Sequence, residues 1–450
     1  MKSISLKHFV NNHSANNLAI VTPNVCLNYR ELQRLNWKGF HRSSVIICCK
    51  YEHNIVKAVV ALDGTAKNFV ILPPVLKDNE FTSILRLQKF DLVLTDSVVP
   101  KIFEKFSISV VEMRDLLHQS DGKSINESVE TSWLVATSGT TATPKLITHT
   151  LRSLTKVSLK QTKHNDKCQV WGLFYDVSRF AGLQVLLNCL LQGHTLVLSA
   201  TYQSFSDRVE FAAENSVSHI SATPTLWRKL LMCEEASKLA LEQITLGGEG
   251  ADQAILRKLN LRFPNARITH VYAATEVGVC FSVSDMKAGY PVSYLRDKNR
   301  GVTAKIVNNK LLVHREEDPK LVKTLVPLTD GNEWIDTGDI ASIRGDRFYV
   351  LGRETGMINV GGEKVIPEVV RGVLLELDFI SDVLVYGKGN SISGQLVAAD
   401  VALKTVMNDD EARKLIDFHS RQYLTSPQRP RFLRFVDLIK VNSTGKAVKD

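Results

Sequence analysis

The sequence contains little that would tie the protein to a membrane or to a disulfide-bonded scaffold. No apolar run approaches the roughly 20 residues that a membrane-spanning helix needs. The first residues, MKSISLKHFVNNHSANN, are too polar to form the apolar region of a secretory signal. The seven cysteines are scattered and form no CxxC pair, which indicates free thiols rather than disulfides or a metal site. We therefore expect a cytoplasmic protein without a membrane span.

The charge pattern also argues against nucleic-acid binding. Lysine and arginine are spread along the whole chain, without a dense basic run that is interleaved with aromatic residues. The formal net charge of +9 could instead attract an anionic cofactor or an acidic carrier protein. With 44% apolar and 23% charged residues, the composition is typical of a packed globular protein. A length of 450 residues predicts two or three domains.

Short apolar runs alternate with helical patterns along most of the chain. Leu18–Thr22 and Val45–Cys49 have the composition of buried strands, and Ile55–Lys67 and Phe205–Asn215 have that of helices. This alternation predicts an α/β fold with mainly parallel sheets that are flanked by helices on both faces.

The stretch from Val135 to Thr150, VATSGTTATPKLITHT, is the most informative part of the sequence. An apolar run that predicts a strand leads into it. Its small and hydroxyl-bearing residues can offer backbone N–H groups and hydroxyls to an anion, and a lysine beyond them adds a positive charge. These residues are Thr137, Ser138, Gly139, Thr140, Thr141 and Lys145. A loop of the GxxxxGK[ST] type is excluded, because Pro144 stands where that pattern needs its second glycine. We expect a polyphosphate-binding loop, with an ordinary Ser/Thr turn as the alternative.

Further polar segments follow in a fixed order. They are LGGEG at 246–250, VYAATEVG at 271–278, WIDTGDIA at 334–341, LGR at 351–353 and NSTGK at 442–446. Together with TSGTTATPK, they resemble the motifs of the adenylate-forming superfamily, which includes acyl-CoA synthetases, peptide-synthetase adenylation domains and luciferases. The resemblance covers nearly the whole chain, although Ala142 and Ala273 replace glycines that the superfamily favours.

The resemblance implies a nucleotide site built from several of these segments. The glycine turn would line the adenine pocket, an aromatic ring would stack on adenine, and a carboxylate and a guanidinium would bind the ribose or a phosphate. The residues in these roles are Gly247, Gly248, Glu249, Tyr272, Asp339 and Arg353. A carboxylate suits a ribose diol because its two oxygens can accept two hydrogen bonds.

The same resemblance implies three residues that act on the reacting groups. Thr275 would contact the α-phosphate, and Glu276 would hold Mg²⁺. Lys446, in the terminal glycine loop, would contact both the carboxylate of the substrate and the α-phosphate. Each role fits the chemistry of its side chain, because a hard cation prefers oxygen ligands and a lysine stabilises developing negative charge.

The acid-binding segment, Trp171–Leu187, leaves two interpretations open. If its Gly-Leu pair is matched to the superfamily's H-x-x-G-L pattern, Arg179 takes the histidine position, which fits an aliphatic or aryl acid. If Tyr175–Ser178 is matched to the F-D-x-S pattern of amino-acid-activating domains, Asp176 binds an amino group. Asp176 could equally cap a helix that starts near Ser178. The substrate-binding candidates are therefore Tyr175, Asp176 and Arg179.

The chain changes character after Arg353, which predicts a second domain. We expect residues 1–353 to form a large domain and residues 354–450 to form a small, mobile α+β domain. In the superfamily the hinge residue lies two positions after the arginine and is Asp or Lys, whereas this chain has Thr355. Gly361 and Gly362 resemble the glycine loop beside the superfamily's pantetheine tunnel.

The resemblance implies an acid–thiol ligase that uses ATP and Mg²⁺. Such an enzyme joins a small carboxylic acid to ATP, giving acyl-AMP and pyrophosphate. It then passes the acyl group to the phosphopantetheine thiol of CoA or of an acyl carrier protein. Two alternatives remain open: a stand-alone amino-acid-activating adenylation enzyme, and a nucleotide-binding homologue without turnover. The departures at Ala142, Ala273 and Thr355 are the reason to consider the second alternative.

Overall fold

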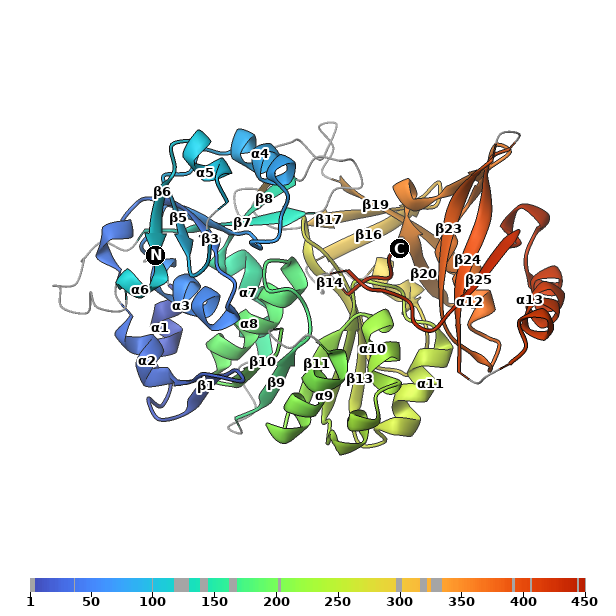
Figure 1. Ribbon diagram of the computed structural model, residues 1–450, viewed down its shortest axis with the longest axis horizontal. Helices are drawn as coiled ribbons and strands as arrows, with labels where there is room; N and C mark the ends of the chain where they lie inside the picture. The colour runs from blue at the N-terminus through green and yellow to red at the C-terminus, as the bar shows by residue number, and fades with distance from the viewer. Residues whose placement is uncertain are drawn as a thin grey trace.

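The chain folds into a large α/β part and a smaller carboxyl-terminal part, which are the blue-to-yellow and orange-to-red regions of Figure 1. The computed structural model describes residues 5–35, 37–98, 100–116, 129–137, 145–161, 168–200, 204–296, 302–315, 322–324, 334–390, 393–404, 407–442 and 445–449. Among these residues, no helix is both long and apolar enough to cross a membrane.

The first sheet has eight strands in the order β14-β13-β12-β11-β9-β10-β1-β2. Its strands are β1 (Leu18–Val21), β2 (Cys26–Asn28), β9 (Val170–Leu173), β10 (Thr195–Leu198), β11 (His219–Ala222), β12 (Gln243–Gly247), β13 (Arg267–Ala274) and β14 (Gly278–Val283). The strands from β13 to β1 are parallel, and only the edge strands β14 and β2 are antiparallel to their neighbours.

The second sheet has seven strands in the order β18-β8-β7-β4-β3-β5-β6. They are β3 (Ser44–Cys48), β4 (Asn68–Ile71), β5 (Leu92–Thr95), β6 (Ser109–Glu112), β7 (Ser132–Thr137), β8 (Lys145–Thr150) and β18 (Val322–Thr324). The strands from β7 to β6 are parallel, whereas β7 and β8 form an antiparallel hairpin. The prediction of an α/β fold with mainly parallel sheets is therefore confirmed.

Helices cover both sheets of the large part (Figure 1). They are α1 (Leu6–Asn11), α2 (Tyr29–Arg34), α3 (Glu52–Leu62), α4 (Asp78–Leu87), α5 (Ile102–Lys105), α6 (Met113–Leu116), α7 (Leu151–Gln161), α8 (Phe180–Gln192), α9 (Phe205–Glu214), α10 (Pro224–Leu231) and α11 (Gln253–Arg262). The helix expected at Ile55–Lys67 is α3, which starts and ends earlier. It cannot extend further because Gly64, at φ +85°, turns the chain back toward the sheet.

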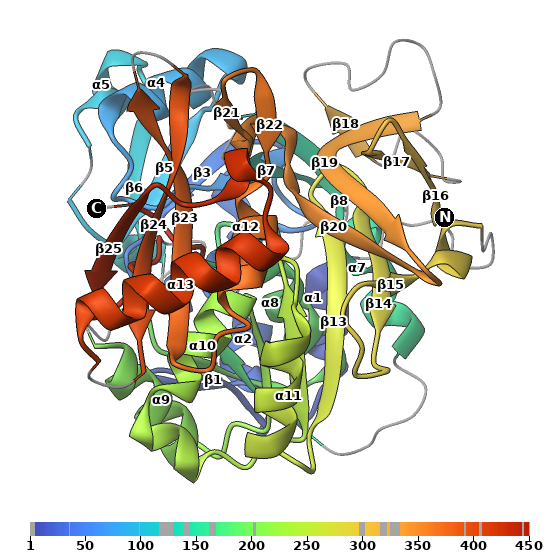
Figure 2. The ribbon, with the colours of Figure 1, turned by 90° about the vertical axis from the view of Figure 1, so that its right-hand side faces the viewer.

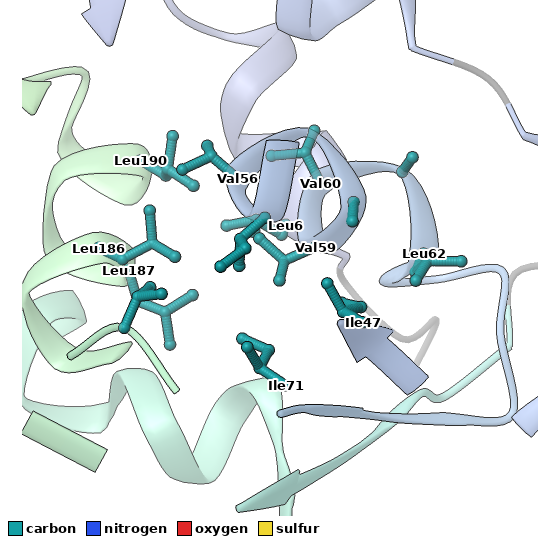
Figure 3. Packing of buried hydrophobic residues seen from close by; sticks show 14 of the residues in the cluster. Leu6, Ile47, Val56, Val59, Val60, Leu62, Ile71, Leu186, Leu187 and Leu190 are labelled. Carbon is teal, nitrogen blue, oxygen red and sulfur yellow. The ribbon is translucent and has the colours of Figure 1, made fainter. Parts of the chain in front are cut away.

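An apolar layer joins the two sheets. In Figure 3, Leu186 and Leu190 of α8 point toward Val56 and Val59 of α3, with Leu6 of α1 close to them. All of these side chains are fully buried. Because burying a leucine or valine side chain stabilises a fold by roughly 1.5–3 kcal/mol, this layer holds α8 firmly against the second sheet.

A third, antiparallel sheet links the large part to the small one. Its strands run in the order β15-β20-β19-β17-β16. They are β15 (Tyr290–Pro291), β16 (Val302–Val307), β17 (Lys310–Arg315), β19 (Trp334–Arg344) and β20 (Arg347–Arg353). The last of these strands ends immediately before the predicted hinge.

The small part contains its own sheet and its own apolar core. The strands are β21 (Ile358–Val360), β22 (Glu363–Val365), β23 (Ile380–Asn390), β24 (Gly394–Leu403) and β25 (Phe432–Val436), and the helices are α12 (Pro367–Leu374) and α13 (Asp409–Tyr423). The core residues all come from this part of the chain, among them Ile358, Val370, Val383 and Ile416. Figure 2 shows α12 and β23 beside α10 of the large part. The small α+β domain is confirmed, and the boundary at residue 353 stays a prediction.

Candidate active site

A cavity of about 1710 Å³ lies between the large part and the small domain. Its walls include the carboxyl ends of β11, β12 and β13, where ligands of parallel α/β sheets usually bind. Most of the site residues that the sequence predicts line it. They are Thr137, Lys145, Tyr175, Asp176, Arg179, Gly247, Gly248, Glu249, Tyr272, Thr275, Glu276, Asp339, Arg353, Thr355 and Lys446.

Three residues that we expect to bind the nucleotide are linked by direct contacts. The Tyr272 hydroxyl donates to Asp339 Oδ2 at 2.6 Å, and Arg353 Nε lies 3.0 Å from Asp339 Oδ1. Asp339 and Arg353 face each other across the β19–β20 pair. Burial raises the pKa of Asp339, while the charge of Arg353 and the hydrogen bond from Tyr272 oppose that rise. The carboxylate is thus fixed in orientation, and its remaining lone pairs can accept ribose hydroxyls.

The two residues that flank the predicted polyphosphate-binding loop lie at the cavity. Thr137 and Lys145 are paired across the β7–β8 hairpin, and both line the cavity. The other predicted loop residues, Ser138, Gly139, Thr140 and Thr141, lie outside the described residues. The phosphate-binding role of this loop stays a prediction.

The glycine turn after β12 is held by its surroundings. Gly248 has φ +78°, a conformation that favours glycine, and the Tyr175 hydroxyl donates to the Gly247 carbonyl oxygen at 3.3 Å. Glu249 Oε2 accepts hydrogen bonds from the Thr225 N–H at 3.1 Å and from the Thr225 hydroxyl at 2.7 Å. The turn is therefore a rigid part of the cavity wall.

Glu276 lies in the turn between β13 and β14, next to Thr275. Its Oε2 is buried and has no hydrogen-bond partner among the described residues. A buried carboxylate oxygen of this kind is costly unless a donor or a cation meets it. Mg²⁺ commonly takes one or two carboxylates and completes its shell with phosphate oxygens and water. Glu276 fits such a site, which needs only one carboxylate from the protein. A site built from protein ligands alone is a different case: among the described residues, no group of three or more His, Cys, Asp or Glu could hold a metal ion.

The terminal glycine loop carries Lys446 into the cavity. The Thr223 hydroxyl donates to the Gly445 carbonyl oxygen at 2.6 Å, across 222 positions of sequence. Gly445 has φ +74°, and a Cβ there would collide with Leu226. Lys446 lies close enough to Asp339 for its charge to oppose the rise in pKa that burial gives this carboxylate. The lysine is thus brought to the predicted nucleotide site by an anchored loop.

The sequence of this region decides the family. The AMP-binding enzyme family matches residues 43–322, which include the loop at Thr137, the glycine turn and Glu276. The chain belongs to the AMP-binding enzyme family.

This AMP-binding enzyme is similar to 2-succinylbenzoate–CoA ligases. It is 27% identical to the chloroplastic/peroxisomal one of Arabidopsis thaliana in an alignment of 374 positions that covers 70% of this chain. The alignment spans 65% of that protein, slightly under two thirds of its length. It is 23% identical to that of Staphylococcus epidermidis in an alignment of 466 positions that covers 96% of this chain and 94% of that protein. The crystal structure of an anthranilate CoA ligase in complex with anthranoyl-AMP has the same fold, with a TM-score of 0.82 at 17% identity over 99% of this chain and 96% of that one.

The predicted acid-binding segment of this AMP-binding enzyme contains two charged candidates, Asp176 and Arg179, which differ in their hydrogen-bond partners. Asp176 Oδ1 accepts a hydrogen bond from the Ser178 N–H at 2.8 Å, within the turn that precedes α8. The capping interpretation is wrong, because α8 begins at Phe180 and its N-cap residue is Arg179, without a side-chain cap. Arg179 donates to the Ala136 carbonyl oxygen at 3.2 Å, and its Nε is buried without a partner in the described chain. Arg179 therefore has unused hydrogen-bonding capacity at this wall.

The predicted glycine loop and hinge lie in different surroundings. Gly361 and Gly362 form the turn between β21 and β22, with φ +59° and +93°, and neither lines the cavity. Thr355 does line it, beside Glu354, which pairs with Lys310 at 2.7 Å. The roles of the glycine loop in the thiol step and of Thr355 as a hinge stay predictions.

Sequence reasoning missed the residues that join the small domain to the site. Arg371 of α12 donates to the Thr225 hydroxyl at 3.1 Å and to Asp382 Oδ1 at 2.7 Å. Thr225 also holds Glu249, so the domain interface and the glycine turn share one side chain. The only local signal was the Thr-Pro-Thr stretch ahead of α10, which marks a helix start and says nothing about a partner on another domain.

Proposed function

We propose that the chain is an ATP-dependent acid–thiol ligase that proceeds through an acyl-adenylate. The observation that carries this proposal is the convergence of Asp339, Arg353, Glu276 and Lys446 on one cavity that also contains the acid-binding segment. The likeness to CoA ligases over most of the chain supports it. The acid, the thiol acceptor and the role of each residue are part of the proposal.

In the first step, an oxygen of the acid carboxylate attacks the α-phosphorus of ATP, and the bond to the β-phosphate oxygen breaks to release pyrophosphate. No nucleophilic side chain is required, so positioning and charge neutralisation carry the catalysis. Tyr272, Asp339 and Arg353 hold the nucleoside end. Lys446 stabilises the negative charge that develops as the two anions meet.

In the second step, the sulfur of a pantetheine thiol attacks the acyl carbon and AMP leaves, while the thiol proton passes to solvent. The small domain is expected to turn about Thr355 between the steps, so that the Gly361-Gly362 turn approaches the cavity. The present arrangement, with Lys446 inside the cavity and Gly361 outside it, suits the first step.

Glu276→Gln is expected to raise the Mg²⁺ concentration needed for half-maximal pyrophosphate release by about tenfold or more. The amide has the same shape but lacks the charge that a divalent cation requires. A Mg²⁺ titration of pyrophosphate release measures the effect, with the exposed Glu411→Gln on α13 as the matched control. An unchanged Mg²⁺ requirement would mean that the cation binds elsewhere.

Arg179→Ala is expected to raise the KM for the acid about tenfold, whereas Asp176→Asn changes it little. The asparagine side chain keeps an oxygen that accepts from the Ser178 N–H, while the alanine removes a cation with a free Nε. Initial rates at varied acid concentration measure both. If Asp176→Asn instead impairs an amino acid substrate and Arg179→Ala does not, the enzyme is an amino-acid-activating one.

The deciding experiment is pyrophosphate exchange with a panel of acids that includes benzoate, anthranilate, 2-succinylbenzoate and amino acids. Exchange with one class of acid is expected, and it is followed by comparing CoA with a phosphopantetheine-bearing carrier as acceptor. Exchange with none of them, together with tight ATP binding, would leave the nucleotide-binding homologue without turnover as the correct alternative.

A further inference from the structure

The first sheet presents polar residues on the face that meets α8. The strand register places Trp171, His219 and Gln243 side by side on β9, β11 and β12. Ser221 and Thr245 form the next row toward the carboxyl ends, together with Thr269 of β13. All six line the cavity. The faces of parallel sheets are normally covered by apolar residues, so a polar face that lines a cavity is unusual. Several of its groups already have hydrogen-bond partners, and their remaining donor and acceptor positions face the cavity.

The opposite wall is a polar stripe on α8. Gln184, Asn188 and Gln192 recur every four residues, so they lie on one face of the helix, and all three line the cavity. The other face of α8 is apolar and packs on α3, as Leu186 and Leu190 show in Figure 3. The polar face of the helix therefore borders the cavity, where the Gln184 amide also donates to the Leu154 carbonyl oxygen of α7 at 2.8 Å. We call the space between this stripe and the two rows of the sheet the polar channel.

The polar channel is deep enough for an extended molecule. From the glycine turn at Gly247 to Gln243 the strand covers four residues, about 13 Å. From Gln184 to Gln192 the helix covers eight residues, about 12 Å. The two walls therefore match in length and run from the reaction site to the amino-terminal edge of the sheet.

The lining groups of the polar channel are hydrogen-bonding groups, and His219 is the one among these nine residues that can carry a charge. The Gln243 amide donates to the hydroxyls of Thr269 at 3.1 Å and of Thr245 at 3.2 Å. The indole of Trp171 packs on the His219 ring with centroids 4.9 Å apart. The six sheet residues and the three helix residues that define the polar channel include no carboxylate. Arg267, which is exposed and paired with Gln243 in register, stands at the far end.

We propose that the acid activated by this enzyme is an extended molecule that carries uncharged oxygen groups, such as hydroxyl or keto groups, well beyond its carboxylate. This inference rests on the proposed function. An unsubstituted hydrocarbon chain in the polar channel would strip water from the amides and hydroxyls without replacing its hydrogen bonds. An oxygenated chain pairs with them, so the polar channel selects against simple fatty acids and leaves short aryl acids without contacts there.

The test compares decanoate, 8-hydroxydecanoate, decanedioate and benzoate as substrates for pyrophosphate release by the full chain. We expect kcat/KM for 8-hydroxydecanoate to exceed that for decanoate by about tenfold or more, since one paired hydroxyl in a built site discriminates at that level. Equal or better turnover of decanoate, or activity with benzoate alone, would overturn the inference. A preference for decanedioate would show that Arg267 selects a second carboxylate. The proposal that the distal groups of the acid are uncharged would then be wrong.

Variants of the polar channel distinguish a loss of hydrogen bonds to the substrate from a general loss of activity. Gln243→Leu and Asn188→Leu, tested separately, are expected to lower the ratio of 8-hydroxydecanoate to decanoate turnover about tenfold. The surface substitution Thr82→Val, on α4, is the control and leaves the ratio unchanged. An unchanged ratio in both channel variants would overturn the assignment even if the wild-type preference is found.

Failure of the proposed function gives a different result. If no acid supports pyrophosphate release, the ligase proposal fails, and calorimetric binding of decanoate and 8-hydroxydecanoate in the presence of ATP still tests the polar channel. Tighter binding of the hydroxylated acid by about tenfold supports the inference. Equal affinities, or no binding of either acid, would overturn it.

Discussion

Lys446→Ala is expected to slow acyl-adenylate formation by about 10²–10³-fold, the usual loss when one preorganised charge stabiliser is removed. The loop that presents Lys446 is anchored by the hydrogen bond from Thr223 to the Gly445 carbonyl oxygen at 2.6 Å. Gly445 also packs tightly against Leu226. The alanine therefore removes the charge without releasing the loop, and the KM for ATP is expected to change far less than kcat.

The measurement is pyrophosphate release at saturating ATP and acid, beside thioester formation from a supplied acyl-adenylate. The second activity is expected to stay within a few-fold of wild type, because it does not require charge neutralisation at the α-phosphate. Lys414→Ala, on the exposed face of α13, is the matched lysine control in the same domain. Near-normal pyrophosphate release by Lys446→Ala would remove the lysine from the mechanism.

Gly361→Trp is expected to abolish thioester formation while pyrophosphate release stays within a few-fold of wild type. Gly361 lies in an exposed turn outside the cavity, with no atom within 4 Å of where its Cβ would be. A large side chain there does not reach the adenylation site, yet it would fill a narrow path for the pantetheine arm once the small domain turns. Mass detection of the acyl thioester beside pyrophosphate release measures both steps on one sample.

Backbone strain must be separated from blockage in this experiment. Gly361 has φ +59°, where a residue with a side chain loses about 1–2 kcal/mol. Gly361→Asn is the control, because asparagine tolerates this conformation and is small. We expect the asparagine variant to keep both activities. Loss of both activities in the tryptophan variant, with a lowered Tm, would point to a disrupted small domain and not to a blocked tunnel.

The sequence alone determined the fold class and most of the groups that meet at the cavity. The glycine turn and the segment with Glu276 each follow a strand of the first, mainly parallel sheet, and the carboxyl ends of parallel strands lie at one edge of a sheet. That is why Glu276 at the end of β13 and the glycine turn at the end of β12 were expected together, and both line the cavity. Lys446 could be matched residue by residue as a lysine after a glycine in a terminal loop, and it lines the same cavity, while its role stays a prediction.

Only the tertiary structure decided which partner each polar group has. The contact between Thr223 and Gly445 spans 222 positions, and Arg371 reaches Thr225 across the domain interface. The polar channel is built in the same way, from a helix stripe and from strands whose register places Trp171 beside His219. Such pairings depend on how separate elements dock, and the local pattern of a strand says which residues share a face but not what will cover that face.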